Sequence, residues 1–325
     1  MMVIEKSGLL TSIQDLGRYG FKKYGVITSG AMDPLSHRIA NLLVGNDENE
    51  PTVEITLYGP TIRFLADTLI SVCGGNLSPS LNNRPMDMSC PIRVQKGDLL
   101  TFGQPKNGCR AYLAVHGGIN INKVMGSHST YLRAQFGGYK GRALQKGDRL
   151  EYRPFNPEWE VIGSNWFASS TIHKEPEGIQ KVRVVEGRHF EEFTKESKDA
   201  FVKETYTVSS QSDRMGYRME GVSLQLSKEK EMISEAVTFG TIQVPANGKP
   251  IILMADSQTI GGYPKIADVI SVDLPVVAQA KPGDSLQFEW VTLDKAQRLY
   301  LNQENQLKLL KRGIGQKFNK GEENV

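Results

Sequence analysis

Residues 241–269 read TIQVPANGKPIILMADSQTIGGYPKIADV, and this stretch decides the fold. Its centre, residues 250–255, is a short apolar run between Asn247-Gly248 and a polar segment, which predicts a strand buried on both faces. A strand of this kind belongs inside a β domain, and its end must reach the surface. The polar residues that follow it are therefore expected to lie where a ligand can meet them.

That polar segment has the composition of a binding site. Asp256, Gln258, Thr259, Tyr263 and Lys265 supply donors, acceptors, an aromatic ring and a cation. Two intervening glycines let a ligand approach the backbone closely. The alternative is an ordinary hairpin loop whose polar side chains bond their own backbone.

The rest of the chain also consists of short apolar runs between Gly and Pro, which predicts a mainly β protein with many short strands. Strands are expected at residues 53–57, 68–73, 92–94, 99–102, 111–115, 181–185, 206–208, 241–244, 251–254, 269–272 and 285–290. Three copies of one turn, at residues 96–98, 146–148 and 282–284, should each reverse the chain into a strand. A few helices are expected, the first starting at Asp33-Pro34 and the others at residues 189–202 and 293–312, followed by a disordered tail.

The two halves of the chain resemble each other faintly. Residues 12–20 and 210–218 both crowd Gln, Asp, Arg, Gly and Tyr into one turn, and residues 107–118 resemble the opening stretch. At roughly 150 residues per domain, the length also favours two domains. The predicted boundaries are 1–170, 171–292 and 293–325, with the seam in residues 158–180. A duplicated β domain leaves a groove between its halves, where ligands commonly bind.

Composition excludes several classes of protein. A net charge of +3 arises from 39 basic and 36 acidic residues, mostly interspersed, so nucleic acid is not an expected partner. No stretch approaches the ~20 apolar residues of a membrane span, and the start lacks the pattern of a signal peptide, so a cytoplasmic protein is expected. Three cysteines without C-x-x-C spacing argue against a disulfide framework or a zinc site.

A glycine-rich loop leads directly into the first predicted helix. Its segment from Ser29 to Asp33 is a candidate wall for an anion, because a helix N-terminus presents unpaired backbone N–H groups. The alternative is that Asp33 fills this position itself as the helix cap.

Two arginines, Arg214 and Arg218, are four residues apart with Asp213 beside the first. In an extended segment both would project to one side and form a clamp for a carboxylate or phosphate. The alternatives are an ion pair between Arg214 and Asp213 that fixes the turn, or a role in an interface.

His116 stands at the end of a predicted buried strand, in the position that Asp256 occupies in the other half. It is a candidate general base, and the alternative is a hydrogen-bonded structural histidine. The other histidines show no metal-ligand spacing, so no metal site is expected.

Several segments in the same order resemble the allophanate hydrolase subunit 2 family, also called the biotin-dependent carboxyltransferase or urea amidolyase-related family. The resemblance covers residues 3 to about 290. The segments that carry it are residues 14–18, 25–26, 29–33, 41–46, 112–114, 117–118, 126–127, 129–130 and 212–218, together with the opening stretch.

The resemblance implies two intertwined cyclophilin-like β-barrel halves. It also implies the C subunit of a 5-oxoprolinase, an enzyme that opens 5-oxo-L-proline to L-glutamate with ATP, in complex with its B and A subunits. ATP would be bound by this chain or by one of these partners. One alternative is a non-catalytic partner that antagonises a cyclophilin-like kinase inhibitor. Another is carboxyl transfer to urea or a related amide, with a separate biotin carrier.

Covalent biotin is not expected on this chain, because no methionine precedes a lysine. The roles that follow from residue chemistry are hypotheses about an amide substrate. Asp256, His116 and Lys265 are the catalytic candidates, Lys265 because its cation can meet developing negative charge. The substrate-binding candidates are Arg214, Arg218, Gln243, Gln258, Thr259, Tyr263, Ser29 and Asp33.

Overall fold

The computed structural model describes residues 1–153, 178–228, 230 and 232–319. The chain divides into two compact units. Unit 1 comprises Met1–Arg18, Ser29–Glu175 and Glu304–Val325, and unit 2 comprises Tyr19–Thr28 and Pro176–Gln303. This division differs from the predicted boundaries, because a short N-terminal segment belongs to unit 2 and the C-terminal segment to unit 1. Most of the predicted seam lies outside the described residues.

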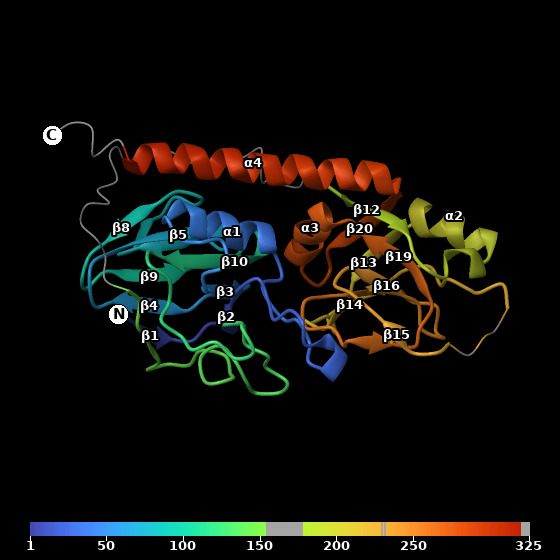
Figure 1. The fold of residues 1–325 in the computed structure, drawn as a ribbon, viewed down its shortest axis with the longest axis horizontal. Coiled ribbons are helices and arrows are strands. Elements are labelled where there is room, and N and C mark those ends of the chain that lie inside the picture. The colour runs from blue at the N-terminus through green and yellow to red at the C-terminus, as the bar shows by residue number, and fades with distance from the viewer. Residues whose placement is uncertain (154–177, 229, 231, 320–325) are drawn as a thin grey trace. The chain divides into compact units, whose positions relative to one another are not determined.

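The described strands of unit 1 form two sheets (Figure 1). One has the order β11-β1-β4-β9-β6-β7 and the other the order β2-β3-β10-β5-β8. The bounds are β1 Met2–Lys6, β2 Leu10–Gln14, β3 Thr52–Thr56, β4 Thr61–Phe64, β5 Thr68–Asn76, β6 Pro79–Leu81, β7 Arg84–Pro85, β8 Ile92–Val94, β9 Leu99–Phe102, β10 Asn107–Val115 and β11 Arg149–Leu150. Apolar side chains from both sheets form one buried core.

A second apolar cluster of unit 1 surrounds helix α1, Pro34–Leu43. The helix packs on β5 and β10, as Figure 1 shows. The same cluster includes Leu307 and Ile314 of the last helix, α4, Leu293–Asn319. Leu307 is 2% exposed, so this part of α4 belongs to the core of unit 1.

Unit 2 contains a closed barrel with the strand order β12-β19-β16-β17-β14-β13-β20. The bounds are β12 Gln180–Glu186, β13 Thr205–Val208, β14 Gly216–Glu220, β16 Thr241–Gln243, β17 Ile251–Leu253, β19 Lys265–Val269 and β20 Ser285–Trp290. Beside the barrel, β15, Glu235–Ala236, pairs with β18, Ile260–Gly261. The mainly β prediction is confirmed, and the apolar run of the opening stretch is a barrel strand.

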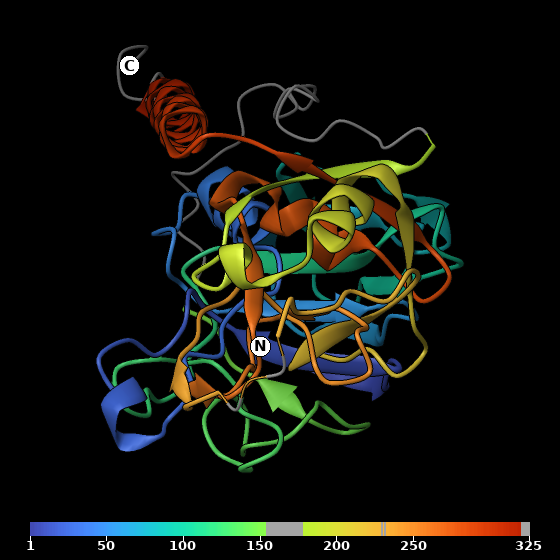
Figure 2. The same cartoon turned by 90° about the vertical axis from the view of Figure 1, so that its right-hand side faces the viewer.

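Short helical segments complete unit 2. They are η1 Lys22–Tyr24, η2 Phe190–Glu192, α2 Lys195–Lys203, η3 Ser271–Asp273 and α3 Leu274–Gln279. The blue turn η1 lies beside the orange strand β15 in both views (Figures 1 and 2). No helix within the described residues is both long and apolar enough to cross a membrane.

Three local predictions were wrong. The helix expected at residues 189–202 begins only at Lys195, because Thr194 caps it with a 3.1 Å bond from the N–H of Ser197. The strand expected at residues 269–272 is instead the end of β19 followed by η3. The tail expected to be disordered is helical as far as Asn319, and residues 320–325 lie outside the described part.

The turn that the sequence predicts at three places in the chain is confirmed. Gly97, Gly147 and Gly283 have φ angles of 100°, 90° and 91°, which only glycine adopts without strain. In each copy the aspartate that follows accepts a hydrogen bond from the backbone N–H three residues before it. Each turn leads directly into a strand, β9, β11 or β20.

Candidate functional site

Unit 2 holds a buried ion pair between Arg214 and Asp256. The guanidinium donates from Nε and Nη2 to the two carboxylate oxygens, at 2.9 and 3.0 Å. Both residues are 4% exposed, and the backbone N–H of Asp256 also donates to the carbonyl of Arg214 at 2.8 Å. A bidentate pair of this kind fixes both groups in one orientation.

The pair between Arg214 and Asp256 shows that the predicted alternative, an ion pair between Arg214 and Asp213, is wrong. Asp213 does not hold Arg214, because its carboxylate accepts bonds from the backbone N–H groups of Met215 and Gly216. The carboxylate that holds Arg214 instead comes from a position 42 residues away in the chain.

A second charged cluster surrounds Glu235 on β15. The Lys265 ammonium lies 2.9 Å from this carboxylate and the Arg188 guanidinium 3.2 Å, and His189 lies at 4.0 Å. The hydrogen bond from Lys265 lowers the pKa of Glu235, and burial lowers the pKa of His189. Two cationic side chains, Lys265 and Arg188, therefore share one carboxylate, which leaves an excess of positive charge.

Two glutamines adjoin the Glu235 cluster. Gln258 follows Asp256 by two residues and donates to Oε1 of Gln243 at 3.4 Å. Gln243 in turn donates to the carbonyl of Tyr263 at 3.4 Å and pairs with Lys265 in the barrel register. By the strand register, Gln243 and Lys265 lie beside the start of β17, whereas Arg214 and Asp256 lie beyond its end. The polar groups of the predicted binding segment are therefore divided between the two ends of the barrel of unit 2.

Thr259 and Tyr263 lie at the edge of this group. The carbonyl of Thr259 accepts a bond from the N–H of Val237 at 3.2 Å, which ties the segment to the β15 region. The Tyr263 side chain is exposed. The hairpin-loop alternative therefore describes Thr259 and Tyr263. The polar cluster consists of Gln243, Gln258, Lys265 and Glu235.

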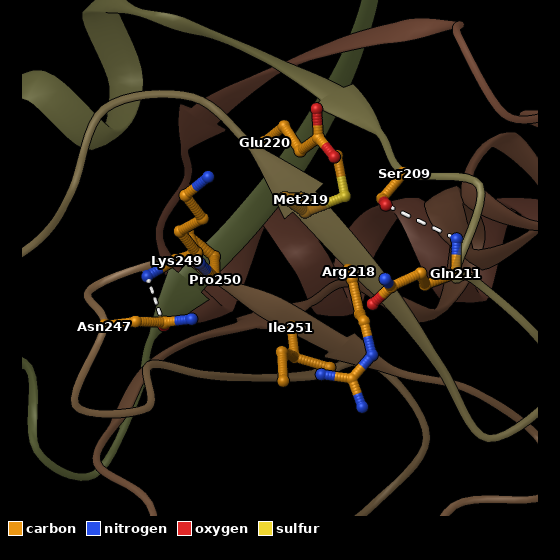
Figure 3. A pocket seen from close by; sticks show the side chains of 9 residues that line it. All are labelled: Ser209, Gln211, Arg218, Met219, Glu220, Asn247, Lys249, Pro250 and Ile251. Carbon is orange, nitrogen blue, oxygen red and sulfur yellow. Dashed lines mark hydrogen bonds between the residues drawn. The ribbon is translucent and has the colours of Figure 1, made fainter.

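Arg218 has a different environment from Arg214. It lies on the solvent side of β14, whose alternate residues Tyr217 and Met219 are buried. It lines a pocket of about 180 Å³ with the other residues drawn in Figure 3, Gln211 and Lys249 among them. The predicted clamp of two arginines is therefore wrong, because the strand begins only at Gly216 and one guanidinium is buried while the other is exposed.

In unit 1, Asp33 is the cap of α1. Its carboxylate accepts bonds from the N–H of Ser36 at 2.9 Å and from the hydroxyl of Ser36 at 2.5 Å. The cap alternative is confirmed, and an incoming anion would meet a carboxylate at this position. Ser29 has a positive φ of 54° and donates to the carbonyl of Thr130 at 3.0 Å.

His116 takes the structural alternative. Its Nδ1 lies 2.8 Å from the carbonyl of Val44, the residue that caps the C-terminus of α1. The ring therefore satisfies one of the carbonyl groups that a helix end leaves without a partner. This bond agrees with the structural alternative, and a catalytic role for His116 stays a prediction.

Asp15 organises a buried network that sequence reasoning did not assign. It is 0% exposed and accepts bonds from Ser127 at 2.7 Å, Ser129 at 2.5 Å and the N–H of His128 at 2.6 Å. Burial raises the pKa of Asp15, but these hydrogen bonds outweigh it and the net shift is downward. The hydroxyls of residues 126–130 thus satisfy a carboxylate inside unit 1, as well as backbone.

Sequence reasoning also missed Glu235 and Arg188. Neither stands in a motif, and Glu235 meets Lys265 from 30 residues away in the chain and Arg188 from 47 residues away. Among the described residues, no group of three or more His, Cys, Asp or Glu side chains is arranged to hold a metal ion.

Comparisons with known proteins agree with this architecture. The chain is 39% identical over 307 residues to the C subunit of 5-oxoprolinase from Haemophilus influenzae, covering 94% of this chain and 96% of that protein. It is also 39% identical over 302 residues to the C subunit of 5-oxoprolinase from Escherichia coli, covering 91% and 93%. The crystal structure of the K. lactis urea amidolyase superposes with a TM-score of 0.88 at 31% identity, covering 95% of this chain but 20% of that one.

A family model described as the carboxyltransferase domain, subdomain A and B, matches residues 24–290. This match reaches into both units and includes the closed barrel and every residue of the polar cluster in unit 2. The chain therefore belongs to the carboxyltransferase domain family, subdomains A and B.

Proposed function

We propose that the chain is the C subunit of an ATP-dependent 5-oxoprolinase, which works with the A and B subunits to convert 5-oxo-L-proline into L-glutamate. One observation carries this proposal: the chain and the C subunits of two 5-oxoprolinases match each other over nearly their whole lengths. Against urea amidolyase, the same chain matches only about a fifth of a much longer protein.

The chemistry of the polar cluster suits this reaction. Opening a lactam places negative charge on the carbonyl oxygen, and the excess positive charge around Glu235 would stabilise it. Lys265 is the cation that would approach the substrate, because it is buried whereas Arg188 is largely exposed. A lactam is a stable amide, so the proposal requires activation by ATP, which we assign to a partner.

The two glutamines would orient the lactam. A lactam offers one N–H donor and one carbonyl acceptor, and a primary amide side chain can meet both. Gln258 uses its amide nitrogen for Gln243, and no protein group in the described part of the chain bonds its Oε1. In this proposal Oε1 of Gln258 accepts the lactam N–H.

The direct test is reconstitution. The purified chain is mixed with the A and B subunits, ATP and 5-oxo-L-proline, and glutamate release is measured with and without the chain. We expect release only with all three proteins. Equal release without this chain would refute the proposal.

Asp256 is the candidate for proton transfer in this proposal, and it has a sharper test. Asp256→Asn keeps the size and one acceptor oxygen but removes the carboxylate, so glutamate release by complexes whose variant chain remains folded should fall by about 10²-fold or more. Lys281→Ala, at an exposed ion pair outside the cluster, is the matched control and should leave release unchanged. Full activity of the Asp256→Asn complex would exclude this role.

Carboxyl transfer is the second candidate function, because the urea amidolyase structure superposes so closely. It predicts a turnover that depends on bicarbonate and a biotinylated carrier protein. Supplying urea, ATP and such a carrier in place of 5-oxo-L-proline separates the two functions.

A further inference from the structure

Unit 2 exposes several large apolar side chains on segments that adjoin one another. Tyr19, Tyr24, Ile233, Ile260 and Tyr263 are 73%, 70%, 87%, 58% and 49% exposed. We call these five residues the aromatic patch. Single exposed apolar residues are ordinary on protein surfaces, but a contiguous group of them marks an interaction surface.

Contacts in the structure show that these segments are neighbours. Lys22, in η1, donates to the carbonyl of Val237 at 3.2 Å, which holds the segment of Tyr24 against the end of β15. β15 pairs with β18, with Ala236 opposite Ile260. A Cβ added at Gly262 would stand 3.2 Å from the Ser234 hydroxyl, so the segment of Tyr263 adjoins that of Ile233. Figures 1 and 2 both show η1 beside β15.

Among the residues that the structure describes, the charged groups around the patch are mostly positive. Lys22 and Lys23 are exposed, the Lys23 ammonium lies 4.9 Å from the centre of the Tyr24 ring, and Arg188 is 71% exposed. The carboxylate of Glu235 is already bonded to Lys265 and Arg188. The patch thus combines tyrosine and isoleucine side chains with a basic rim.

We propose that the aromatic patch is the docking surface for a separate protein subunit whose contact face is apolar and carries carboxylates. This inference rests on the proposed function, in which the chain works with partner subunits. Tyrosine and arginine are enriched where protein interfaces bind most strongly. A second copy of the chain is disfavoured as the occupant, because equivalent basic rims would repel each other.

The position of the patch gives docking a consequence for the chemistry. Tyr263 and Ile260 belong to the same segment as Gln258 and Lys265, and Glu235 of β15 bonds Lys265 directly. A partner seated on the patch would therefore cover the Lys265–Glu235 cluster. Excluding water there strengthens the electrostatic interactions that the proposed reaction needs.

The test measures binding of the full-length chain to the purified B subunit of 5-oxoprolinase by titration calorimetry. Tyr24→Ala and Ile260→Asp should each weaken binding at least tenfold, and Lys22→Glu should weaken it while reducing its sensitivity to salt. Leu9→Asp, at a residue 63% exposed in unit 1, is the matched control and should bind as the wild type does. Circular dichroism and thermal unfolding confirm that each variant is folded.

Unchanged affinity in both patch variants would overturn the inference. A wild-type chain that ignores the B subunit and instead forms a dimer lost in Ile260→Asp, seen by light scattering, would also overturn it. If the patch variants weaken binding but the wild-type chain does not support glutamate release, the docking surface is supported and the proposed function is refuted.

Discussion

Arg214 and Asp256 carry opposite charges in surroundings from which water is almost excluded. Asp256→Ala would leave the guanidinium buried without this carboxylate, and breaking a buried pair costs about 3–5 kcal/mol. We therefore expect a large fall in the free energy of unfolding, measured by urea denaturation. Lys281→Ala breaks an exposed pair with Asp284 and should cost less than about 1 kcal/mol. Equal losses in the two variants would contradict this account.

His37 gives the protein a pH dependence. It is fully buried and contacts Thr52 and Asn41, and burial lowers its pKa from 6.5 to about 4. Between these values the unfolded chain binds a proton that the folded chain does not, so stability falls as pH falls. From pH 7 to 5 the loss from this group is about 2 kcal/mol.

The test compares the free energy of unfolding of the wild type with that of His37→Gln, measured by urea denaturation at pH 7, 6 and 5. The variant should be less stable throughout, because glutamine cannot reproduce both ring contacts, but the difference from wild type should shrink towards pH 5. A constant difference across this range would show that His37 does not titrate as described.

At the scale of single residues, the sequence indicates which side chains matter but not their partners. Asp256, Gln258 and Lys265 stand out because polar residues follow a buried strand. Their partners, Arg214 and Glu235 among them, come from distant positions that only the fold of unit 2 brings near. The sequence wrongly predicts that Arg218 lies on the same side as Arg214. The alternation of buried and exposed residues in β14 starts only at Gly216, between the two arginines.

The turns that lead into strands depend on glycine. Gly283 has a φ of 91°, and apart from its chain neighbours no atom of the described residues lies within 4 Å of a Cβ added there, so alanine would be strained by its backbone alone. We expect Gly283→Ala to lower stability by about 1–2 kcal/mol. Gly313 is also open to space but lies inside helix α4, so Gly313→Ala should raise stability by up to about 1 kcal/mol. Thermal unfolding should give a lower melting temperature for Gly283→Ala and a higher one for Gly313→Ala. A change in the same direction in both variants would contradict this prediction.

Among the elements, those with clear ends were predictable. The strands at residues 92–94, 99–102 and 285–290 match the structure, because turn residues bound each apolar run. Residues 269–272 carry a similar apolar pattern but lead into η3, where Asp273 bonds Arg183. That bond is tertiary, and no local pattern predicts it.

For the whole molecule, the proposed function predicts a complex that works without biotin. Avidin sequesters biotinylated carriers, so it should not affect glutamate release by the reconstituted subunits. The carboxyl-transfer function predicts the opposite with urea, where avidin should abolish turnover. Inhibition of glutamate release by avidin would show that a carrier takes part.

At this largest scale the sequence predicted a mainly β protein, and its motifs pointed to the family that the comparisons confirm. It did not predict that residues 19–28 belong to unit 2 and residues 304–325 to unit 1. Such exchanges of short segments leave no mark in composition or periodicity. The expected groove between two duplicated halves remains a prediction.

The turn that occurs at residues 96–98, 146–148 and 282–284 offers a way to stabilise the protein. The residue before its glycine is Lys96, Lys146 or Pro282, so the turn accepts proline there, as turns with a left-handed glycine commonly do. At Lys96 the backbone N–H is already bonded to Asp67, which excludes proline. Lys146→Pro should instead restrict the unfolded chain, raising the melting temperature by reducing the entropy gained on unfolding.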